Sequence, residues 1–259
     1  MRTELASAPS DAGRPNEDFA GVGLPASGQG GSVVVLDGVT PPRSGTGCLH
    51  SVPWFTARLG GALTELTVSL TDVPLADTLS RALARTAEAH AATCDLSHPR
   101  TPQATVVLAR WNPDTVEYLV LSDSALLLES PDGAVTPVLD DRLALLPRSA
   151  LATDALVDAT VRNKEGGFFT AAADPAVARR AVTGSVPRRE VRALAALTDG
   201  ATRWVERFGE GDWTDCFRLV RKEGPQALVD RVRTLERSAT TGTYRGKRHD
   251  DATVVYVEF

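Results

Sequence analysis

Runs of apolar residues along the chain change their period several times, and these changes predict where strands and helices lie. Short continuous or alternating apolar runs bounded by Asn, Asp, Gly or Pro are typical of strands. They cover residues 2–8, 18–24, 33–36, 104–111, 116–122, 125–130, 135–139, 191–198 and 252–257. Turn signals separate the four runs between 104 and 139, which predicts consecutive hairpins.

Five other stretches carry apolar residues every three or four positions, which predicts amphipathic helices. They are residues 46–70, 75–93, 202–208, 214–222 and 225–238. Residues 140–190 show little periodicity and contain several Pro and Gly, so we expect a helical, loop-rich insertion there. Strands, two helices, a strand meander, more helices and a last strand follow in that order. This order predicts an α+β fold in which helices cover a sandwich of sheets.

Short acidic runs stand where predicted strands begin or end. There are four: Asn16-Glu17-Asp18, Leu36-Asp37-Gly38, Thr198-Asp199-Gly200 and His249-Asp250-Asp251. In an antiparallel sheet the end of one strand lies beside the start of its neighbour, so these carboxylates can gather on one edge. Clustered carboxylates repel one another unless a cation lies among them, and divalent ions with oxygen ligands are the usual solution. The pattern predicts a metal site.

Composition excludes several classes of function. The chain has 259 residues, 42% hydrophobic and 24% charged, as is typical of a globular protein. A net charge of −5 argues against nucleic acid as a partner. No apolar run reaches the ~20 residues that a membrane helix needs, and the N-terminus lacks the order of a secretory signal. We therefore expect a cytoplasmic protein that binds no membrane.

The cysteines and histidines give no metal pattern of their own. Cys48, Cys94 and Cys216 are odd in number, widely spaced and without a Cys-x-x-Cys pair, which indicates neither a disulfide framework nor a zinc knuckle. We expect reduced, mostly buried thiols. The histidines show no metal-ligand spacing, which argues against a zinc hydrolase. They are His50, His90, His98 and His249.

Six motifs follow one another along nearly the whole chain. They are Asn16-Glu17-Asp18, Val34-Val35-Leu36-Asp37-Gly38, the Thr- and Ala-containing run at 101–107, Leu121-Ser122-Asp123-Ser124, Leu197-Thr198-Asp199-Gly200 and Asp250-Asp251-Ala252-Thr253-Val254. Each motif alone is weak, but their joint order resembles the metal-dependent protein phosphatase family (PPM, type 2C). The resemblance implies a four-layer αββα sandwich of two antiparallel sheets flanked by helices. It also implies a single domain over 1–259, with a flap-like insertion at 140–190.

The resemblance implies a division of labour among the acidic residues. Asp37 would bridge two cations, and Asp199 and Asp250 would hold one of them. The Gly38 carbonyl and Glu17 or Asp18 would hold the other, partly through water. Oxygen ligands favour Mg²⁺ or Mn²⁺ over zinc. Two such ions about 3.5–4 Å apart neutralise a phosphate and generate hydroxide from bound water.

Three further residues are candidates with an ordinary alternative each. Asp123 is a candidate ligand for a third ion, and otherwise forms an Asx turn. Arg14 could grip the substrate phosphate bidentately. It lies one residue from the family's usual position, however, and its alternative is a solvated surface arginine. His249 could transfer a proton or orient Asp250, and otherwise is a turn histidine.

The substrate side departs from the family's pattern. Val39-Thr40 stands where the family often has a Gly-Gly-His stretch, so that general acid is missing. The Gly and Arg of its Gly-Asp-Ser-Arg turn are replaced by Ser122 and Ala125. Gly166-Gly167-Phe168-Phe169 with Arg179 and Arg180 could shape substrate access, and otherwise the aromatics pack in the core and the arginines are solvated. The basic Arg245, Lys247 and Arg248 could attract an anionic substrate, and otherwise form a solvated loop.

The leading hypothesis is a Mg²⁺/Mn²⁺-dependent phosphatase that hydrolyses phosphoserine or phosphothreonine in proteins by attack of hydroxide bridging two metals. A second hypothesis keeps the chemistry but takes a small phosphorylated metabolite, because the usual histidine and arginine are missing. A third is a non-catalytic regulatory module that has kept the scaffold.

Overall fold

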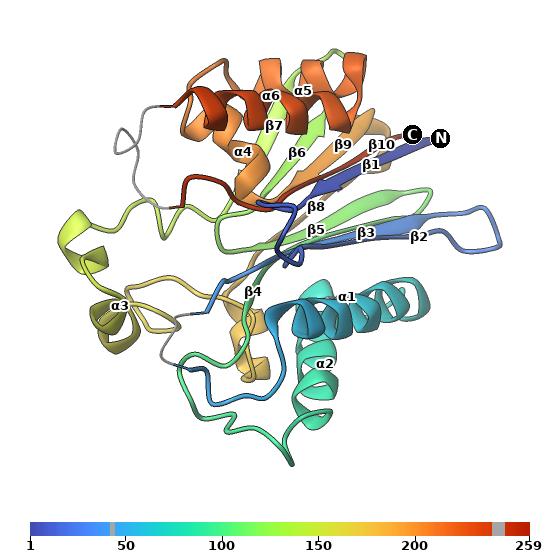
Figure 1. The fold of residues 1–259 in the computed structure, drawn as a ribbon. Helices are drawn as coiled ribbons and strands as arrows, with labels where there is room; N and C mark the ends of the chain where they lie inside the picture. Colours follow the sequence, from blue (N-terminus) through green and yellow to red (C-terminus); the bar gives the residue numbers. More distant parts are fainter. Residues whose placement is uncertain (42–44, 240–246) are drawn as a thin grey trace.

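Two five-stranded antiparallel sheets lie face to face between two layers of helices in the computed structural model, which describes residues 1–41, 45–239 and 247–259 (Figure 1). The first sheet has the order β1 (Arg2–Ala8), β10 (Ala252–Glu258), β9 (Ala193–Leu197), β6 (Ala125–Glu129) and β7 (Val135–Leu139). The second has the order β2 (Phe19–Gly23), β3 (Gly31–Gly38), β4 (Ala104–Trp111), β5 (Thr115–Leu121) and β8 (Val182–Pro187). The predicted α+β, four-layer αββα sandwich is confirmed.

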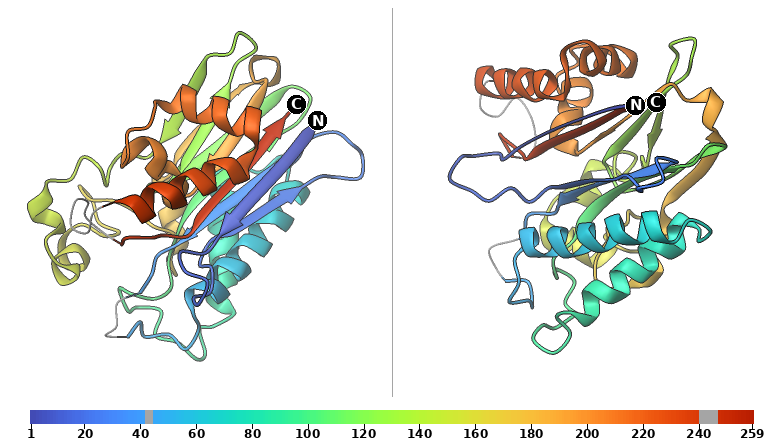
Figure 2. Two further views of the ribbon diagram at one scale, coloured as in Figure 1. Left: turned by 45° about the horizontal axis from the view of Figure 1, so that its top comes forward. Right: turned by 90° about the vertical axis from the view of Figure 1, so that its right-hand side faces the viewer.

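Helices cover the outer face of each sheet. The second sheet is covered by α1 (Val52–Ser69) and α2 (Leu75–Glu88), and the first by α4 (Asp199–Glu206), α5 (Trp213–Glu223) and α6 (Pro225–Ser238) (Figure 2). Beyond one end of the sheets lies α3 (Asp154–Thr160) (Figure 1). Short 3₁₀ helices occur at Arg148–Leu151, Pro175–Arg180 and Arg188–Glu190.

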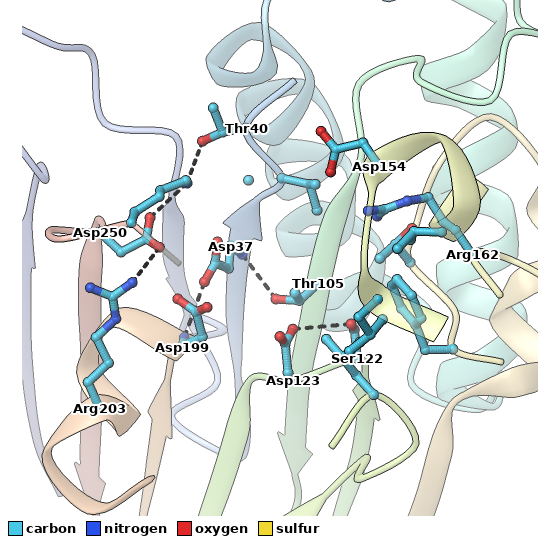
Figure 3. A pocket seen from close by; sticks show the side chains of 18 of the residues that line it. Asp37, Thr40, Thr105, Ser122, Asp123, Asp154, Arg162, Asp199, Arg203 and Asp250 are labelled. Carbon is cyan, nitrogen blue, oxygen red and sulfur yellow. Dashed lines mark hydrogen bonds and ion pairs between the residues drawn. The ribbon is translucent and has the colours of Figure 1, made fainter. Parts of the chain in front are cut away.

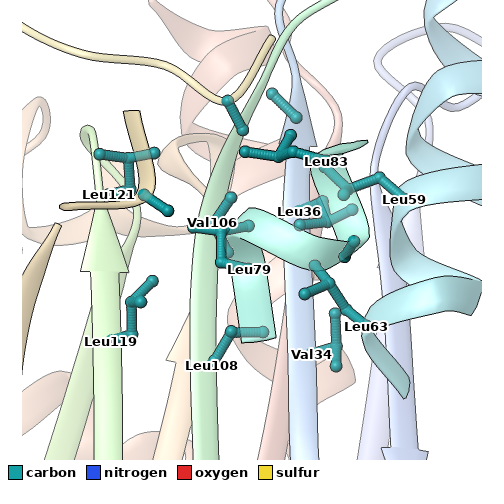
Figure 4. Packing of buried hydrophobic residues seen from close by; sticks show 14 of the residues in the cluster. Val34, Leu36, Leu59, Leu63, Leu79, Leu83, Val106, Leu108, Leu119 and Leu121 are labelled. Carbon is teal, nitrogen blue, oxygen red and sulfur yellow. The ribbon is translucent and has the colours of Figure 1, made fainter. Parts of the chain in front are cut away.

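Alternation along β3 shows how the layers are held together. Val33 and Val35 face the other sheet and belong to the core between the sheets, together with Leu126 and Val255. Val34 and Leu36 face the opposite way, onto α1 and α2. There they join a cluster that includes Leu59, Leu63, Leu79 and Leu83 (Figure 4). Because side chains of a strand alternate between its two faces, β3 is apolar on both.

Several elements differ from the sequence-based prediction. The helix expected at 75–93 ends at Glu88, and the helix expected at 202–208 covers Asp199–Glu206. The helix expected from residue 46 begins at Val52, because the Ser51 side chain accepts a hydrogen bond from the Trp54 N–H and caps it. Part of the expected loop-rich insertion is strand β8, which pairs with β5 over six residue pairs, Thr115↔Pro187 to Val120↔Val182. No residue of this edge strand is buried and apolar residues do not alternate along it, so it lacks the apolar signal of a buried strand.

Within the described ranges, no helix is both long and apolar enough to cross a membrane.

Candidate active site

Four of the predicted acidic residues line one cavity of about 480 Å³ at the end of the sandwich (Figure 3). Asp37 is near the end of β3, and Asp123 lies in the turn between β5 and β6. Asp199 is the first residue of α4, directly after β9, and Asp250 precedes β10. Both sheets therefore contribute to the site, and the turn that carries Asp123 passes from one sheet to the other.

Asp37 lies at the centre of this group. Its backbone N–H donates to Oγ1 of Thr105 at 3.3 Å, and its Oδ2 accepts the backbone N–H of Asp199 at 3.1 Å. Removal from solvent, followed by the charges of Asp199 and Asp18, raises the pKa of Asp37 well above its ordinary value. The site thus favours either a proton or a cation at this carboxylate.

Asp18 lies behind the cavity, where Oδ2 accepts hydrogen bonds from Oγ1 of Thr198 at 3.0 Å and of Thr253 at 2.7 Å. Burial raises the pKa of Asp18 to about 8, and burial followed by the charges of Asp123 and Asp250 raises that of Asp199 to about 7. Oδ1 of Asp18 and Oδ1 of Asp199 are buried and have no hydrogen-bond partner among the described residues. Orphaned carboxylate oxygens in a like-charged cluster are the donor set that a hard divalent cation takes, so these residues fit Mg²⁺ or Mn²⁺.

Asp123 accepts a hydrogen bond of 3.1 Å from Oγ of Ser122, whose φ of 70° is in the left-handed region. Burial raises the pKa of Asp123, although the hydrogen bonds to its own N–H and to Ser122 partly offset it. The carboxylate lines the cavity with Asp37 and Asp199. Its role at a third ion stays a prediction.

Asp250 forms two ion pairs that the sequence did not predict. Its Oδ2 accepts from Arg203 at 2.8 Å and its Oδ1 from Lys247 at 3.0 Å. Arg203 also pairs with the fully buried Glu236 at 2.6 Å. Each carboxylate oxygen has a second lone pair, so these contacts leave room for a cation ligand at Asp250.

His249 contacts the same buried acid, with 2.9 Å between its Nδ1 and Oε2 of Glu236. It lines a second pocket of about 350 Å³ and does not line the main cavity. This geometry favours the orienting role over direct proton transfer to substrate in the main cavity.

Glu17 and Arg14 also line the second pocket, which shares Thr40, Lys247 and Asp250 with the main cavity. The side chain of Thr40 donates to the Glu17 carboxylate, whose pKa burial raises. The exposed Arg14 does not line the main cavity. Its phosphate-binding role stays a prediction.

Two glycines permit the close approach of the segments that build the site. A Cβ at Gly38 would lie 2.4 Å from the backbone oxygen of Glu17, and one at Gly200 would lie 1.9 Å from that of Asp251. Asp251 in turn accepts the backbone N–H groups of Ser10 and Glu17, both at 2.6 Å. The second acid of the Asp250-Asp251 pair is therefore structural: it fixes the segment that carries Glu17 and Asp18.

The remaining walls of the cavity are part basic and part apolar. Arg162, Arg203, Arg207 and Lys247 line it, and Leu143, Val157 and Phe168 come from the 140–190 segment (Figure 3). The predicted flap segment therefore borders the site. Phe169 instead packs in the core beside α2, under Arg180. Arg248 bonds to the carbonyl of Arg237 at 3.2 Å, and Arg245 lies outside the described residues.

Comparison with known proteins decides the family. The family model described as protein phosphatase 2C matches residues 8–233. The chain belongs to the protein phosphatase 2C family. No curated protein matches it.

Solved structures of this family share the fold at low identity. The serine/threonine phosphatase Stp1 from Staphylococcus aureus is 13% identical with a TM-score of 0.61, covering 100% of this chain and 95% of its own. The Ser-Thr phosphatase MsPP from Mycobacterium smegmatis, in complex with cacodylate, is 16% identical with a TM-score of 0.58 over 100% and 98%. PstP/Ppp from Mycobacterium tuberculosis is 18% identical with a TM-score of 0.57 over 99% and 97%. Protein phosphatase 2C domains are normally metal-dependent hydrolases, and a further match, RsbX, was crystallised with magnesium.

Among the residues of this protein phosphatase 2C site that the sequence analysis did not identify, the most important is Arg203, which forms an ion pair with Asp250. It stands four residues after Asp199 on α4, so helical geometry places both on one face toward Asp250. That i, i+4 spacing was a readable signal. Arg162 and Thr40 had no comparable signal, because their approach to the site depends on how distant segments pack.

One sequence-based inference about this protein phosphatase 2C domain is wrong. The cysteines and histidines were expected to show no metal arrangement and the thiols to be mostly buried. The structure instead brings Cys48, His50, His90 and Cys94 together, with their ligand atoms within 4.8 Å of one another, and buries only Cys216 fully. The linear spacing missed this because the two pairs lie on segments about forty residues apart.

Proposed function

We propose that this chain is a Mg²⁺- or Mn²⁺-dependent phosphomonoesterase that hydrolyses phosphoserine and phosphothreonine in proteins. The observation that carries the proposal is the carboxylate cluster itself. Asp18 and Asp199 each bury an oxygen without a hydrogen-bond partner among the described residues, beside a central Asp37 that accepts from Asp199. Such a cluster is costly to keep unless cations complete it.

The family resemblance assigns the ligands, and Asp37, Asp123, Asp199 and Asp250 line the cavity as that assignment requires. Asp37 would contact both ions, Asp199 and Asp250 one of them, and the Gly38 carbonyl with Glu17 or Asp18 the other, while Asp123 would serve a third. When bound, the ions supply an acidified water and neutralise the negative charge of the phosphate. The chain's own contribution is to position the acids: Thr198 and Thr253 donate to the Asp18 carboxylate, and Thr105 accepts the backbone N–H of Asp37.

Basic residues at the cavity supply the charge that an anionic substrate needs. Lys247 is 44% exposed and holds both Asp250 and Oγ1 of Thr40, at 3.0 and 2.6 Å. It is the cation best placed to meet a phosphate at the rim. Arg203 is committed to Glu236 and Asp250, so it positions the ligand Asp250.

The test is Mn²⁺-stimulated hydrolysis of an aryl phosphate and of phosphopeptides. Asp37→Asn should lower the rate at least about 100-fold while the fold survives. Asp114→Asn, which changes an exposed turn carboxylate in the same way, should leave it unchanged. Equal rates in Asp37→Asn and the unaltered protein would contradict the proposal.

A small phosphorylated metabolite is the second candidate substrate. The cavity of about 480 Å³ has an apolar wall of Leu143, Val157 and Phe168, which suits a small organic phosphate. A panel of phosphopeptides and phosphometabolites at equal concentration distinguishes the two. A strong preference for peptides excludes the second candidate.

A non-catalytic regulatory role is the third candidate. The double ion pair of Asp250 with Arg203 and Lys247 favours it, because these cations compete with metal. Calorimetry of Mn²⁺ binding decides: no binding supports the third candidate and contradicts the first.

A further inference from the structure

Four ligand-type side chains from two distant segments converge outside the phosphatase site. Cys48 and His50 directly precede α1, and His90 and Cys94 follow α2. Sγ of Cys48 lies 3.8 Å from Nδ1 of His50, 3.3 Å from Nδ1 of His90 and 2.7 Å from Sγ of Cys94. Nδ1 of His50 also lies 3.4 Å from Sγ of Cys94. None of the four lines the main cavity.

These distances are close to the edges of a zinc tetrahedron. Zn–S bonds of about 2.3 Å and Zn–N bonds of about 2.0–2.1 Å give S···N edges of about 3.5 Å and an S···S edge of about 3.8 Å. The three S···N distances, 3.3, 3.4 and 3.8 Å, match. The S···S distance of 2.7 Å is about 1 Å shorter, so a bound ion requires the two sulfurs to move apart.

Local backbone structure presents each pair to the same point. The Cys94 N–H donates to the His90 carbonyl at 3.0 Å, so a single helical turn places both residues on one face. On the other segment, the His50 N–H donates to Sγ of Cys48 at 3.4 Å, and the Leu49 N–H to Sγ of Cys94 at 3.3 Å. Backbone donors to sulfur favour the thiolate, which is the form that binds metal.

The pKa values of the two thiols shift in opposite directions. Burial, followed by the hydrogen bond to Cys94, raises the pKa of Cys48 to about 11. Burial also opposes ionisation of Cys94, but hydrogen bonds from Cys48, His50 and Leu49 outweigh it and lower the pKa of Cys94 to about 5.

The surroundings position the two imidazoles for ligation. His90 is only 2% exposed, and its Nε2 has no hydrogen-bond partner among the described residues, so the thiols are the polar groups that it faces. The ring of Trp54 lies 3.9 Å from that of His50 and 5.2 Å from that of His90, between centroids. A disulfide would require only the two sulfurs. A zinc site requires four ligands, and His50 and His90, which face the sulfurs, supply the other two.

We propose that Cys48, His50, His90 and Cys94 bind one structural zinc ion. Four protein ligands close the coordination sphere and leave no position for substrate, which is typical of structural sites. Mixed thiolate and imidazole ligands select zinc over the hard Mg²⁺ and Mn²⁺. The chain would thus hold two metal sites of different chemistry, and this one does not depend on the phosphatase activity.

The ion would fasten residues 48–50, just before α1, onto the end of α2. Thr40, which contacts Glu17 and Lys247 at the phosphatase site, precedes Cys48 by eight positions in the sequence. Cys48 and Cys94 are separated by 46 positions, so a zinc ion bound by both would close a long loop and lower the conformational entropy of the unfolded chain. Loss of the ion should lower the midpoint of thermal unfolding by roughly 5 °C or more.

Elemental analysis of the purified chain under reducing conditions tests the proposal. We expect about one tightly held zinc ion per chain, and its loss in Cys94→Ser and His90→Ala. Cys216→Ser and His98→Ala are matched controls that remove a cysteine and a histidine outside the cluster, and both should keep the ion. Asp37→Asn should also keep it, which separates this site from the carboxylates.

Cobalt substitution of the unaltered protein is a second measurement that does not depend on how the variants fold. Tetrahedral Co²⁺ with thiolate ligands should give intense visible ligand-field bands together with a thiolate-to-metal charge-transfer band. The absence of zinc and of these bands overturns the proposal, as does zinc that survives in Cys94→Ser. A mass lower by two hydrogen atoms in the metal-free protein, with Cys48 and Cys94 linked, also overturns it and assigns a disulfide.

Discussion

The backbone N–H of Asp199 donates a hydrogen bond of 3.1 Å to Oδ2 of Asp37 and so joins the first residue of α4 to the end of β3. This contact crosses from one sheet to the other. It places the two carboxylates side by side, and after burial the charge of Asp199 is the largest cause of the raised pKa of Asp37.

The first prediction concerns the stability of the metal-free protein as a function of pH. The pKa values of Asp18 and Asp199, about 8 and about 7 in the folded state, lie far above the ordinary 3.8. Between about pH 4 and pH 8 the folded state holds protons that the unfolded state has released, so stability falls as pH rises. In chelator, the thermal midpoint should be higher at about pH 5.5 than at about pH 8.

Mn²⁺ should reverse this trend, because it binds the deprotonated carboxylates. The midpoint shift caused by Mn²⁺ should be larger at high pH, and Asp18→Asn should flatten the pH dependence in chelator. The lowered pKa of Glu236 acts in the opposite sense only below about pH 4.5, and the lowered pKa of Cys94 does so above about pH 5. The net fall in stability therefore depends on the larger number of carboxylates with raised pKa values, to which Asp37 and Asp123 also belong. A chelated protein that is more stable at pH 8 contradicts the prediction.

The second prediction concerns Arg203. Arg203→Ala removes one of the three partners of the fully buried Glu236 and leaves Arg233 and His249. It also removes one of the two ion pairs of Asp250. We expect a loss of about 3 kcal/mol in the free energy of unfolding and a weaker affinity for Mn²⁺. Arg231→Ala, which breaks the exposed pair with Glu223, should cost less than about 0.5 kcal/mol. Denaturant titration measures both, and equal costs would argue against the buried network.

The third prediction concerns Lys247. Its ammonium occupies Oδ1 of Asp250 and faces the cavity. Lys247→Ala should strengthen Mn²⁺ binding several-fold by removing a competing cation, and should raise KM for an anionic substrate several-fold. Calorimetry and steady-state kinetics measure the two effects. Lys247→Arg should retain the low KM, and Lys222→Ala, on α5, should change neither.

The fourth prediction concerns His249. Its contact with Glu236 makes it a positioning residue beside Asp250. His249→Gln should lower the rate roughly 10-fold at limiting Mn²⁺, and excess Mn²⁺ should restore it with the pH–rate profile unchanged. If the loss persists at saturating Mn²⁺ and one limb of the profile disappears, His249 is instead a general acid.

The fifth prediction compares two glycine substitutions. Gly200→Ala introduces a Cβ 1.9 Å from the Asp251 carbonyl oxygen, so we expect destabilisation of about 3 kcal/mol or more. Gly61→Ala, at a helical position with open space around it, should stabilise the protein by about 0.5–1 kcal/mol. Opposite shifts of the thermal midpoint confirm the pair; a shift of the same sign in both contradicts it.

The parts of this fold that were predictable are those with a local signal. The apolar period predicted α6 to the residue. Of the acidic residues at strand ends, Asp37, Asp199 and Asp250 line one cavity, as antiparallel pairing of ends and starts predicts. Strand β8 escaped prediction because an exposed edge strand need not be apolar.

Long-range side-chain contacts could not be predicted in the same way. The ion pairs of Asp250 depend on the arrival of Arg203 and Lys247 from two sides. The meeting of Cys48 with Cys94 depends on the packing of α1 against α2, which no spacing along the chain encodes. Two local pairs were the trace of that cluster in the sequence: Cys48 with His50, two positions apart, and His90 with Cys94, one helical turn apart.

The division of the acids between two sheets has a consequence for variation in this protein. Asp37 is carried by one sheet and Asp250 by the other, and Val35, Leu126 and Val255 fill the layer that holds the sheets apart. Close-packed interiors transmit small changes of volume. A methyl group gained or lost in this apolar core between the sheets therefore changes the distance between Asp37 and Asp250, although it lies outside the site. The spacing of the acids can change through evolution in this way while every carboxylate remains in the sequence.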